Sequence, residues 1–428
     1  MREMKDSGIE WIGKIPEEWT KDKAIRLFNI IGSGTTPKNI TSDFPCVNWI
    51  QSGDINGSLI SSCKNNVSES IISQYSALKI YAAPFIVIAM YGASVGNTSI
   101  SLIDGCVNQA CCVLSASIYN LNYAFYAIKS SQNYLIRKAI GGGQPNISQD
   151  TIKQLWLPLP ALHEQKRIAA FLDAECAEID AVLEKTRASI EEYKKLKQAV
   201  ITQAVTKGIR GDRPMKNSGS VWFEEIPCNW VMKRIKYLFH IKKDIAGKEG
   251  YTVLSITQRG IQPKDLSKNE GQIAANYSQY QLLAPGDFAM NHMDLLTGWV
   301  DISKYSGVTS PDYRVFVLDD TEKNDSSYYL YLMQMCYFNR IFYGLGQGVS
   351  GMGRWRLQAD KFLNFPVVVP PVDEQKEIAS YLNEKCSCIE VMIAKKQQYL
   401  TEIETYKKSL IYEYVTGKKE VKTSVLAD

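Results

Sequence analysis

Residues 157–172 read LPLPALHEQKRIAAFL and residues 367–382 read VVVPPVDEQKEIASYL, so one helix start occurs twice at an offset of 210. Neither proline nor glycine interrupts residues 164–207 or 374–416. Apolar side chains recur there in steps of 3, 4 or 7, which is typical of an amphipathic helix. The two stripes are Ile168, Leu172, Ile179, Leu183, Ile190, Tyr193, Leu196 and Val200, and Ile378, Leu382, Ile389, Ile393, Leu400, Ile403, Leu410 and Tyr414. We therefore predict two long helices.

These helices are too long and too narrowly apolar to be stable alone. At a rise of about 1.5 Å per residue the first would be roughly 60 Å long. The economical arrangement is an antiparallel two-helix coiled coil, in which each helix covers the stripe of the other. The alternative is that each helix packs only on its own domain.

A second block repeats at an offset of 211, where residues 4–30 return as residues 215–241. Trp11 and Trp19 return as Trp222 and Trp230, and the pair Ile15-Pro16 also recurs. We interpret these residues as packing anchors. Because no such block follows the second helix, we expect the N-terminal segment to pack beside that helix.

The segments between the repeats, residues 31–156 and 242–366, cannot be aligned with each other. Apolar runs at residues 85–88, 251–254 and 313–318 favour strands, and residues 122–138 and 327–342 favour helices. We predict an α+β (mixed α/β) fold of two globular domains joined by two long antiparallel coiled-coil helices, with a pseudo-two-fold internal repeat. The expected divisions are 1–156, 157–210, 211–366 and 367–428.

Composition and motifs argue against several classes of protein. The start of the chain has no apolar run, and the most hydrophobic stretch, residues 80–90, is too short to span a bilayer and contains Pro84. We therefore expect a cytoplasmic protein with no membrane contact. The three histidines are scattered, and the ten cysteines form no C-x-x-C pair, so no metal site is expected. Methyltransferase, P-loop and nuclease motifs are missing, which indicates a chain without catalytic residues or cofactors of its own.

Recognition of nucleic acid remains. The net charge of +4 is small, so basic residues would have to gather on one face. Amide and guanidinium groups on glycine-rich backbone suit contacts to base edges, and small donors suit phosphates. The candidate DNA-binding residues are Ser33, Thr35, Thr36, Lys38, Gln144, Asn146, Arg259, Asn291, Gln347, Arg354 and Arg356. For the glycines around Ser33, a simple role in turns is an equal alternative.

The Pro-x-x-x-Glu-Gln-Lys helix start resembles the specificity subunit of type I restriction-modification enzymes. The stretches GIEWIGKIP (8–16), SGDI (52–55) and PGDFAMN (285–291) fit the same family, and the resemblance covers nearly the whole chain. The second copy departs from the first at Glu377, where the first has Arg167.

The resemblance implies two target-recognition domains, each binding one part of a split asymmetric site in double-stranded DNA, with the helices as a ruler. It also implies two modification (methyltransferase) subunits docked on the repeated scaffold, where the candidate docking residues are Glu164, Gln165, Lys166, Glu374, Gln375 and Lys376. S-adenosylmethionine would bind those subunits, and separate restriction subunits would use ATP and magnesium. The alternatives are a scaffold or adaptor that binds protein partners through two divergent domains, or a self-sufficient DNA enzyme.

Overall fold

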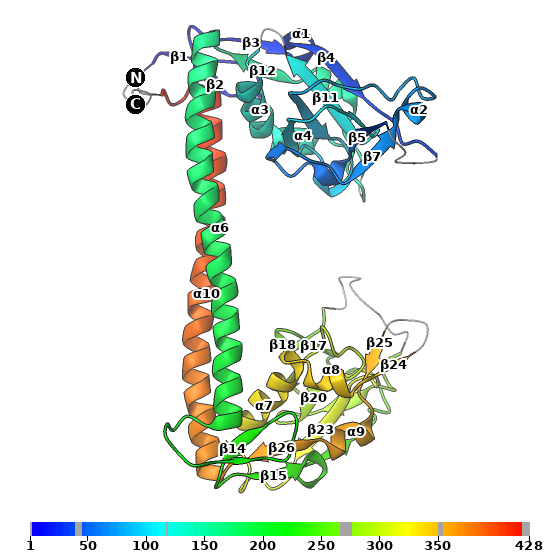
Figure 1. Cartoon of the computed structure of the whole chain (residues 1–428), viewed down its shortest axis with the longest axis vertical. Helices are drawn as coiled ribbons and strands as arrows, with labels where there is room; N and C mark the ends of the chain where they lie inside the picture. The colour runs from blue at the N-terminus through cyan, green and yellow to red at the C-terminus, as the bar shows by residue number, and fades with distance from the viewer. Residues whose placement is uncertain are drawn as a thin grey trace. The chain divides into compact units, whose positions relative to one another are not determined.

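A computed structural model describes residues 2–38, 45–116, 119–141, 143–265, 276–349 and 354–421 (Figure 1). The chain forms two compact units. Unit 1 contains residues 1–186 and 398–428, and unit 2 contains residues 187–397. Each unit therefore includes a globular domain and a part of both long helices, whereas the four sequence divisions separate the helices from the domains.

The two long helices are confirmed. Helix α6 is Leu162–Lys207 and helix α10 is Val372–Val415. Each is followed by a glycine with positive φ, Gly208 at +79° and Gly417 at +70°, because a left-handed residue satisfies the last carbonyls of a helix. Within the described residues, no helix combines the length and the apolarity that crossing a membrane requires.

Within each unit the two helices run antiparallel, side by side in Figure 1. In unit 1, the rings of Phe171 and Tyr414 lie 4.5 Å apart, and Lys407 Nζ lies 2.6 Å from Asp180 Oδ1. In unit 2, Lys197 forms an ion pair with Glu390. The ends of the stripes also belong to the domain cores, as Ile168 and Leu172 do in unit 1. The predicted pairing of the two helices is thus confirmed, and the alternative that each helix packs only on its own domain is wrong, although the ends of the stripes do pack on the domains.

Unit 1 contains a five-stranded sheet in the order β4-β11-β8-β9-β6, a three-stranded sheet in the order β10-β5-β7, and the ribbons β1-β2 and β12-β3. The strands are β1 (Met4–Asp6), β2 (Lys14–Pro16), β3 (Thr20–Lys23), β4 (Phe28–Ser33), β5 (Cys46–Ile50), β6 (Leu59–Ile60), β7 (Asn65–Ser68), β8 (Phe85–Ala89), β9 (Thr98–Ser101), β10 (Gly105–Val107), β11 (Cys111–Ala116) and β12 (Trp156–Leu159). The shorter helices are α1 (Ala24–Leu27), α2 (Glu69–Ile72), α3 (Leu121–Ser130), α4 (Gln132–Lys138) and α5 (Gln149–Lys153).

Unit 2 contains a four-stranded sheet in the order β16-β23-β20-β21 and five two-stranded ribbons among its described residues. The strands are β13 (Met215–Asn217), β14 (Glu225–Pro227), β15 (Val231–Arg234), β16 (Phe239–Lys242), β17 (Leu254–Thr257), β18 (Gly260–Pro263), β19 (Gln281–Leu283), β20 (Phe288–Met290), β21 (Val300–Ile302), β22 (Gly307–Thr309), β23 (Arg314–Leu318), β24 (Gln347–Val349), β25 (Arg354–Arg356) and β26 (Pro366–Val369). The shorter helices are α7 (Ser326–Phe338), α8 (Ile341–Leu345) and α9 (Ala359–Asn364).

The two domains share a sheet that their sequences do not reveal. Strands β4-β11-β8-β9 of unit 1 and β16-β23-β20-β21 of unit 2 have the same order and the same antiparallel directions. Phe28 pairs with Ala116 in one sheet, and Phe239 pairs with Leu318 in the other. Any apolar residue of suitable size can fill such buried strands, so the fold is kept while the sequences diverge.

Three details differ from the sequence expectations. The strand expected at residues 251–254 begins only at Leu254. Leu196 on the first stripe is 48% exposed, and Trp222 is 37% exposed although its counterpart Trp11 is buried. The other anchors are confirmed, because Trp19, Trp230, Ile15 and Ile226 are each at most 1% exposed.

Candidate nucleic-acid interface

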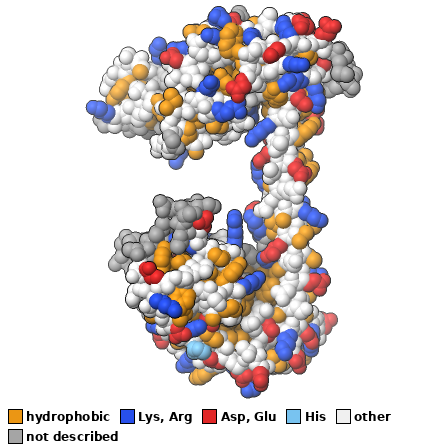
Figure 2. All heavy atoms as spheres, turned by 180° about the vertical axis from the view of Figure 1, so that it is seen from behind, with side chains coloured by type: hydrophobic (Ala, Val, Ile, Leu, Met, Phe, Trp, Pro, Cys, Tyr) orange, Lys and Arg blue, Asp and Glu red, His pale blue; other side chains and the backbone are white. Residues whose placement is uncertain are grey.

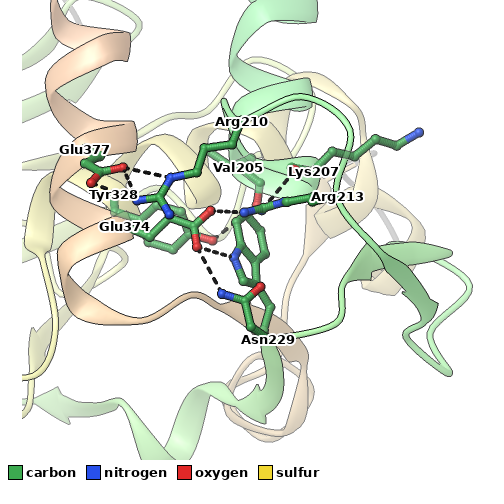
Figure 3. Close-up of polar contacts among 9 residues, drawn as sticks. Val205, Lys207, Arg210, Arg213, Asn229, Tyr328, Glu374 and Glu377 are labelled. Carbon is green, nitrogen blue, oxygen red and sulfur yellow. Dashed lines mark hydrogen bonds and ion pairs between the residues drawn. The ribbon is translucent and has the colours of Figure 1, made fainter.

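A buried polar joint holds the start of α10 in unit 2 (Figure 3). The Glu374 carboxylate, 2% exposed, accepts a hydrogen bond of 2.9 Å from Trp230 Nε1 and forms an ion pair with Arg213. Burial alone would raise the pKa of Glu374, but the hydrogen bonds from Trp230 and Arg213 outweigh it and hold the pKa below its usual value. The carboxylate is therefore charged, and its partners are side chains of the same chain.

Unit 1 contains the same joint. Glu164 accepts a hydrogen bond of 2.9 Å from Trp19 Nε1, and Arg2 Nη1 lies 2.7 Å from Glu164 Oε1. The Arg2 and Arg213 positions share the offset of 211, so the first repeat begins two residues earlier than the sequence analysis placed it. Extending that offset toward the N-terminus would have found both arginines.

The neighbouring glutamines repeat as well. Gln165 Nε2 donates to the Pro160 carbonyl at 2.9 Å, and Gln375 Nε2 donates to the Pro370 carbonyl at 2.9 Å. Each glutamine also accepts a hydrogen bond of 2.8 Å from the backbone N–H that precedes a domain helix, α3 or α7. The Glu-Gln pair therefore locks a long helix to its domain.

A buried tyrosine on each domain helix reaches the end of the opposite long helix. Tyr123 Oη donates to the Val415 carbonyl at 2.8 Å, and Tyr328 Oη donates to the Val205 carbonyl at 3.2 Å. Tyr412 Oη donates to the Ile12 carbonyl at 3.1 Å. This contact confirms that the N-terminal segment packs beside the second helix.

The structure places the candidate docking residues in two groups. Glu164, Gln165, Glu374 and Gln375 are buried in the joints and have partners within the chain. Lys166 and Lys376 directly follow these buried pairs in the sequence, and both lysines are exposed. The docking role stays a prediction, and a partner would meet the two lysines rather than the buried pairs.

Ser33, the last residue of β4, and the candidates just after it lie in unit 1. Ser33 Oγ donates to the Cys111 carbonyl at 2.7 Å, and Thr36 Oγ1 donates to Gln109 Oε1 at 2.6 Å. Thr35 is half-buried and Lys38 is exposed. A Cβ at Gly34 would lie 1.7 Å from the Val107 carbonyl oxygen, so this glycine allows close packing within the chain. This glycine therefore has a structural role, but that role is close packing rather than the turn offered as the alternative.

Two candidates of unit 1 lie on a short hairpin. Ile140 and Asn146 pair through two backbone hydrogen bonds of 2.9 and 3.0 Å, and the side chains of Gln144 and Asn146 are exposed. The next residue, Ile147, donates its N–H to the Met90 carbonyl at 2.9 Å, which fixes the hairpin beside the end of β8.

Unit 2 has a hairpin in the same place. Gln347 pairs with Arg356 in the ribbon β24-β25, and Leu357 donates its N–H to the His292 carbonyl at 2.9 Å. Arg356 is exposed, whereas the amide oxygen of Gln347 accepts a hydrogen bond of 2.8 Å from Gln358. The backbone of Arg354 lies in β25, and its side chain is outside the described residues.

The two remaining candidates have different surroundings. Arg259 is exposed at the tip of the β17-β18 hairpin. Asn291 Oδ1 accepts hydrogen bonds of 3.2 Å from the backbone N–H groups of Met293 and Asp294, so it shapes the loop after β20. The structure brings Arg356 and Asn291 to adjacent segments, because Leu357 hydrogen-bonds the residue after Asn291.

Sequence reasoning missed a buried basic pair beneath the unit 2 hairpin. Arg314, 5% exposed, donates from Nη2 to the Leu357 carbonyl at 2.8 Å. Burial and the charge of Arg356 lower its pKa to about 10. Burial and the charges of Arg314 and Arg356 lower the pKa of His292 to about 3, so this histidine is neutral. A hydrophobic strand gives no sign in sequence that its first residue is a buried arginine.

Charge elsewhere is mixed. On the face shown in Figure 2, Lys and Arg side chains alternate with Asp and Glu over both units, without one continuous basic field. Among the residues that the structure describes, no cluster of His, Cys, Asp and Glu could hold a metal ion. On this face, contacts to an anionic partner would therefore have to be local.

Comparison with known proteins agrees with this architecture. The family described as "Type I restriction modification DNA specificity domain" matches residues 16–192 and 227–402. The MjaVIII type I restriction enzyme specificity subunit of Methanocaldococcus jannaschii is 23% identical over 319 residues, which are 70% of each chain. The MjaIX specificity subunit of the same organism is 25% identical over 236 residues, about half of each chain.

A solved structure described as the "structural basis underlying complex assembly and conformational transition of the type I R-M system" shares the fold. It superposes with a TM-score of 0.69 at 14% identity, over 95% of this chain and 99% of that one. Since the family matches most of the sequence in two copies, the chain belongs to the type I restriction-modification DNA specificity family.

Proposed function

We propose that this specificity subunit binds a bipartite, asymmetric site in double-stranded DNA, one half-site per domain, and docks two modification subunits. The observation that carries the proposal is the contrast between the joints and the hairpins. Both joints use the same Arg, Trp and Glu, whereas the two hairpins expose different side chains from one place in the fold. A repeated scaffold suits a partner bound twice, and unlike domains suit unlike half-sites.

Catalysis would belong to the partners. In this proposal the modification subunits bind S-adenosylmethionine and methylate adenine, and restriction subunits use ATP and magnesium. This chain would contribute sequence selection, through side chains that meet base edges, and positioning, through side chains that meet phosphates.

The long helices would set the spacing of the half-sites, because α6 and α10 each continue from one unit into the other. Four residues would be inserted after Ala188 in α6, and four more at the position in α10 that lies opposite. Each insertion lengthens its helix by about 6 Å at 1.5 Å per residue. With about 3.4 Å per base pair, we expect the spacer to grow by one or two base pairs. A methylated motif with an unchanged spacer would contradict this role and leave the helices as a docking surface.

The direct experiment is selection of bound duplexes from a random pool by the chain assembled with its modification subunits. The expected result is enrichment of one split motif with two unlike halves. Enrichment of a single undivided motif would contradict the bipartite site. The absence of enrichment for any sequence would instead favour an adaptor for protein partners.

A further inference from the structure

The two hairpins occupy equivalent positions down to the single residue. In unit 1, Cys112 of β11 pairs with Ile88 of β8, and the Met90 carbonyl, two residues on, accepts from Ile147. In unit 2, Arg314 of β23 pairs with Met290 of β20, and the His292 carbonyl, two residues on, accepts from Leu357. The residues just before Ile147 and Leu357 are Asn146 and Arg356.

The same short helix follows in both units. Helix α5 begins at Gln149 and leads to β12, and helix α9 begins at Ala359 and leads to β26. Asn146 and Arg356 are both exposed, and both close a hairpin, opposite Ile140 and Gln347. One structural position therefore carries an amide in unit 1 and a guanidinium in unit 2.

The buried residues next to this position differ in charge between the two units. In unit 1 it is apolar, since Met90 and Cys112 are buried in the hydrophobic core. In unit 2 the equivalent residues are His292 and Arg314, 6% and 5% exposed. Among the described residues, no carboxylate pairs with Arg314 or Arg356, and His292 Nδ1 has no hydrogen-bond partner.

A buried cation without a carboxylate partner is costly to a fold, because burial removes its hydration, and the Phe362 ring, 4.9 Å from the Arg314 guanidinium, offsets part of that cost. Arg314 also holds the carbonyl of Leu357, the residue that follows Arg356. The positive charge of Arg314 and its hydrogen bond to the Leu357 carbonyl would both favour an electron-rich group that approaches the hairpin from outside. The edge of guanine in the major groove offers two acceptors, O6 and N7, whereas adenine offers one acceptor and one donor.

We propose that Asn146 and Arg356 are the equivalent base-reading residues of the two domains, and that Asn146 reads an adenine and Arg356 a guanine. The inference rests on the proposed function and adds to it the position and the base. A guanidinium supplies only donors, as guanine requires, and an amide supplies one donor and one acceptor, as adenine requires.

The test exchanges the two side chains, as Arg356→Asn and Asn146→Arg, in the full chain assembled with its modification subunits. Selection from random duplexes, over a range of salt, gives the motif and the salt dependence. For Arg356→Asn we expect loss of one guanine preference in one half-site, with discrimination falling about tenfold to a hundredfold. For Asn146→Arg we expect loss of one adenine preference in the other half-site.

Arg234→Asn is the matched control, because Arg234 is an exposed arginine of the same unit away from the hairpin. It should leave the motif unchanged. Arg356→Lys keeps the charge and can still donate to guanine O6 and N7, but it lacks the planar fork, so it should weaken the guanine preference while keeping the salt dependence. This variant decides the matter even if Arg356→Asn fails to fold.

Two results would overturn the inference. An unchanged motif in both exchange variants would show that this position does not read bases. Equal weakening on all sequences, with a salt slope reduced by about one unit, would assign Arg356 to a phosphate. If the assembly that contains the chain without substitutions selects no sequence at all, the proposed function fails instead. The two failures are therefore distinguishable.

Discussion

The joints and the hairpins vary in opposite ways between the two units. The joint is buried and nearly identical in both, with Trp19 and Trp230 donating to Glu164 and Glu374 at the same distance of 2.9 Å. The hairpin is exposed, and its closing residue changes from Asn146 to Arg356. A buried charged network tolerates little substitution, because the loss of one member leaves the others without their hydrogen-bond partners. An exposed residue on a fixed backbone can change freely, which is what a reader of different sequences requires.

The largest effect is expected from removing a joint carboxylate. Glu374→Ala leaves Arg213 and the Trp230 N–H without their acceptor, and breaking a buried pair costs about 3–5 kcal/mol. The matched control is Glu377→Ala, one turn along on the same helix. Its ion pair with Arg210 is exposed to solvent and screened by it, so we expect a much smaller loss. Urea unfolding of the purified chain measures both, and equal losses would show that the joint is not special.

A smaller effect is expected from removing one donor. Trp230→Phe keeps an aromatic ring but loses the Nε1 donor to Glu374, and a hydrogen bond to a charged group contributes about 1.5–3 kcal/mol. Trp19→Phe should have an effect of similar size, because the joint repeats. Thermal unfolding of both variants tests this, and a large loss in only one would contradict the equivalence of the joints.

The smallest effect is a dependence on pH. The lowered pKa of Glu374 in the fold means that its charge stabilises the protein above the pKa of the unfolded chain, about 4.3. That contribution is lost as the pH falls through the folded pKa. The stability difference between the natural chain and Glu374→Gln should therefore shrink from about pH 5 downward. Unfolding midpoints at several pH values give this difference, and a constant value would argue against a charged Glu374.

The sequence predicted the helices well because their signals are local. A stripe of apolar residues, a preceding proline and a following glycine suffice to place α6 and α10 within two residues of their ends. The joints were visible only as repeated letters, since Trp19 and Glu164 are 145 residues apart and nothing local pairs them. The resemblance implied a docking surface at these residues, which stays a prediction, and the structure shows that both carboxylates are buried.

The hairpins were partly predictable. Gln144, Asn146 and Arg356 stood out as polar side chains near glycines, but their equivalence depends on backbone hydrogen bonds to the Met90 and His292 carbonyls. Backbone registers leave no mark on side-chain identity. Arg314 and His292 were missed for a related reason. What sets them apart is that they are buried, and the sequence does not show their burial.

The central claim is that a repeated scaffold carries two independent readers. Its most direct test is methylome sequencing of a host that expresses a hybrid chain, in which residues 31–156 come from another specificity subunit. We expect a motif in which one half is new and the other half and its methylated adenine are unchanged. New bases in both halves would contradict the account, because the two domains would then not read independently.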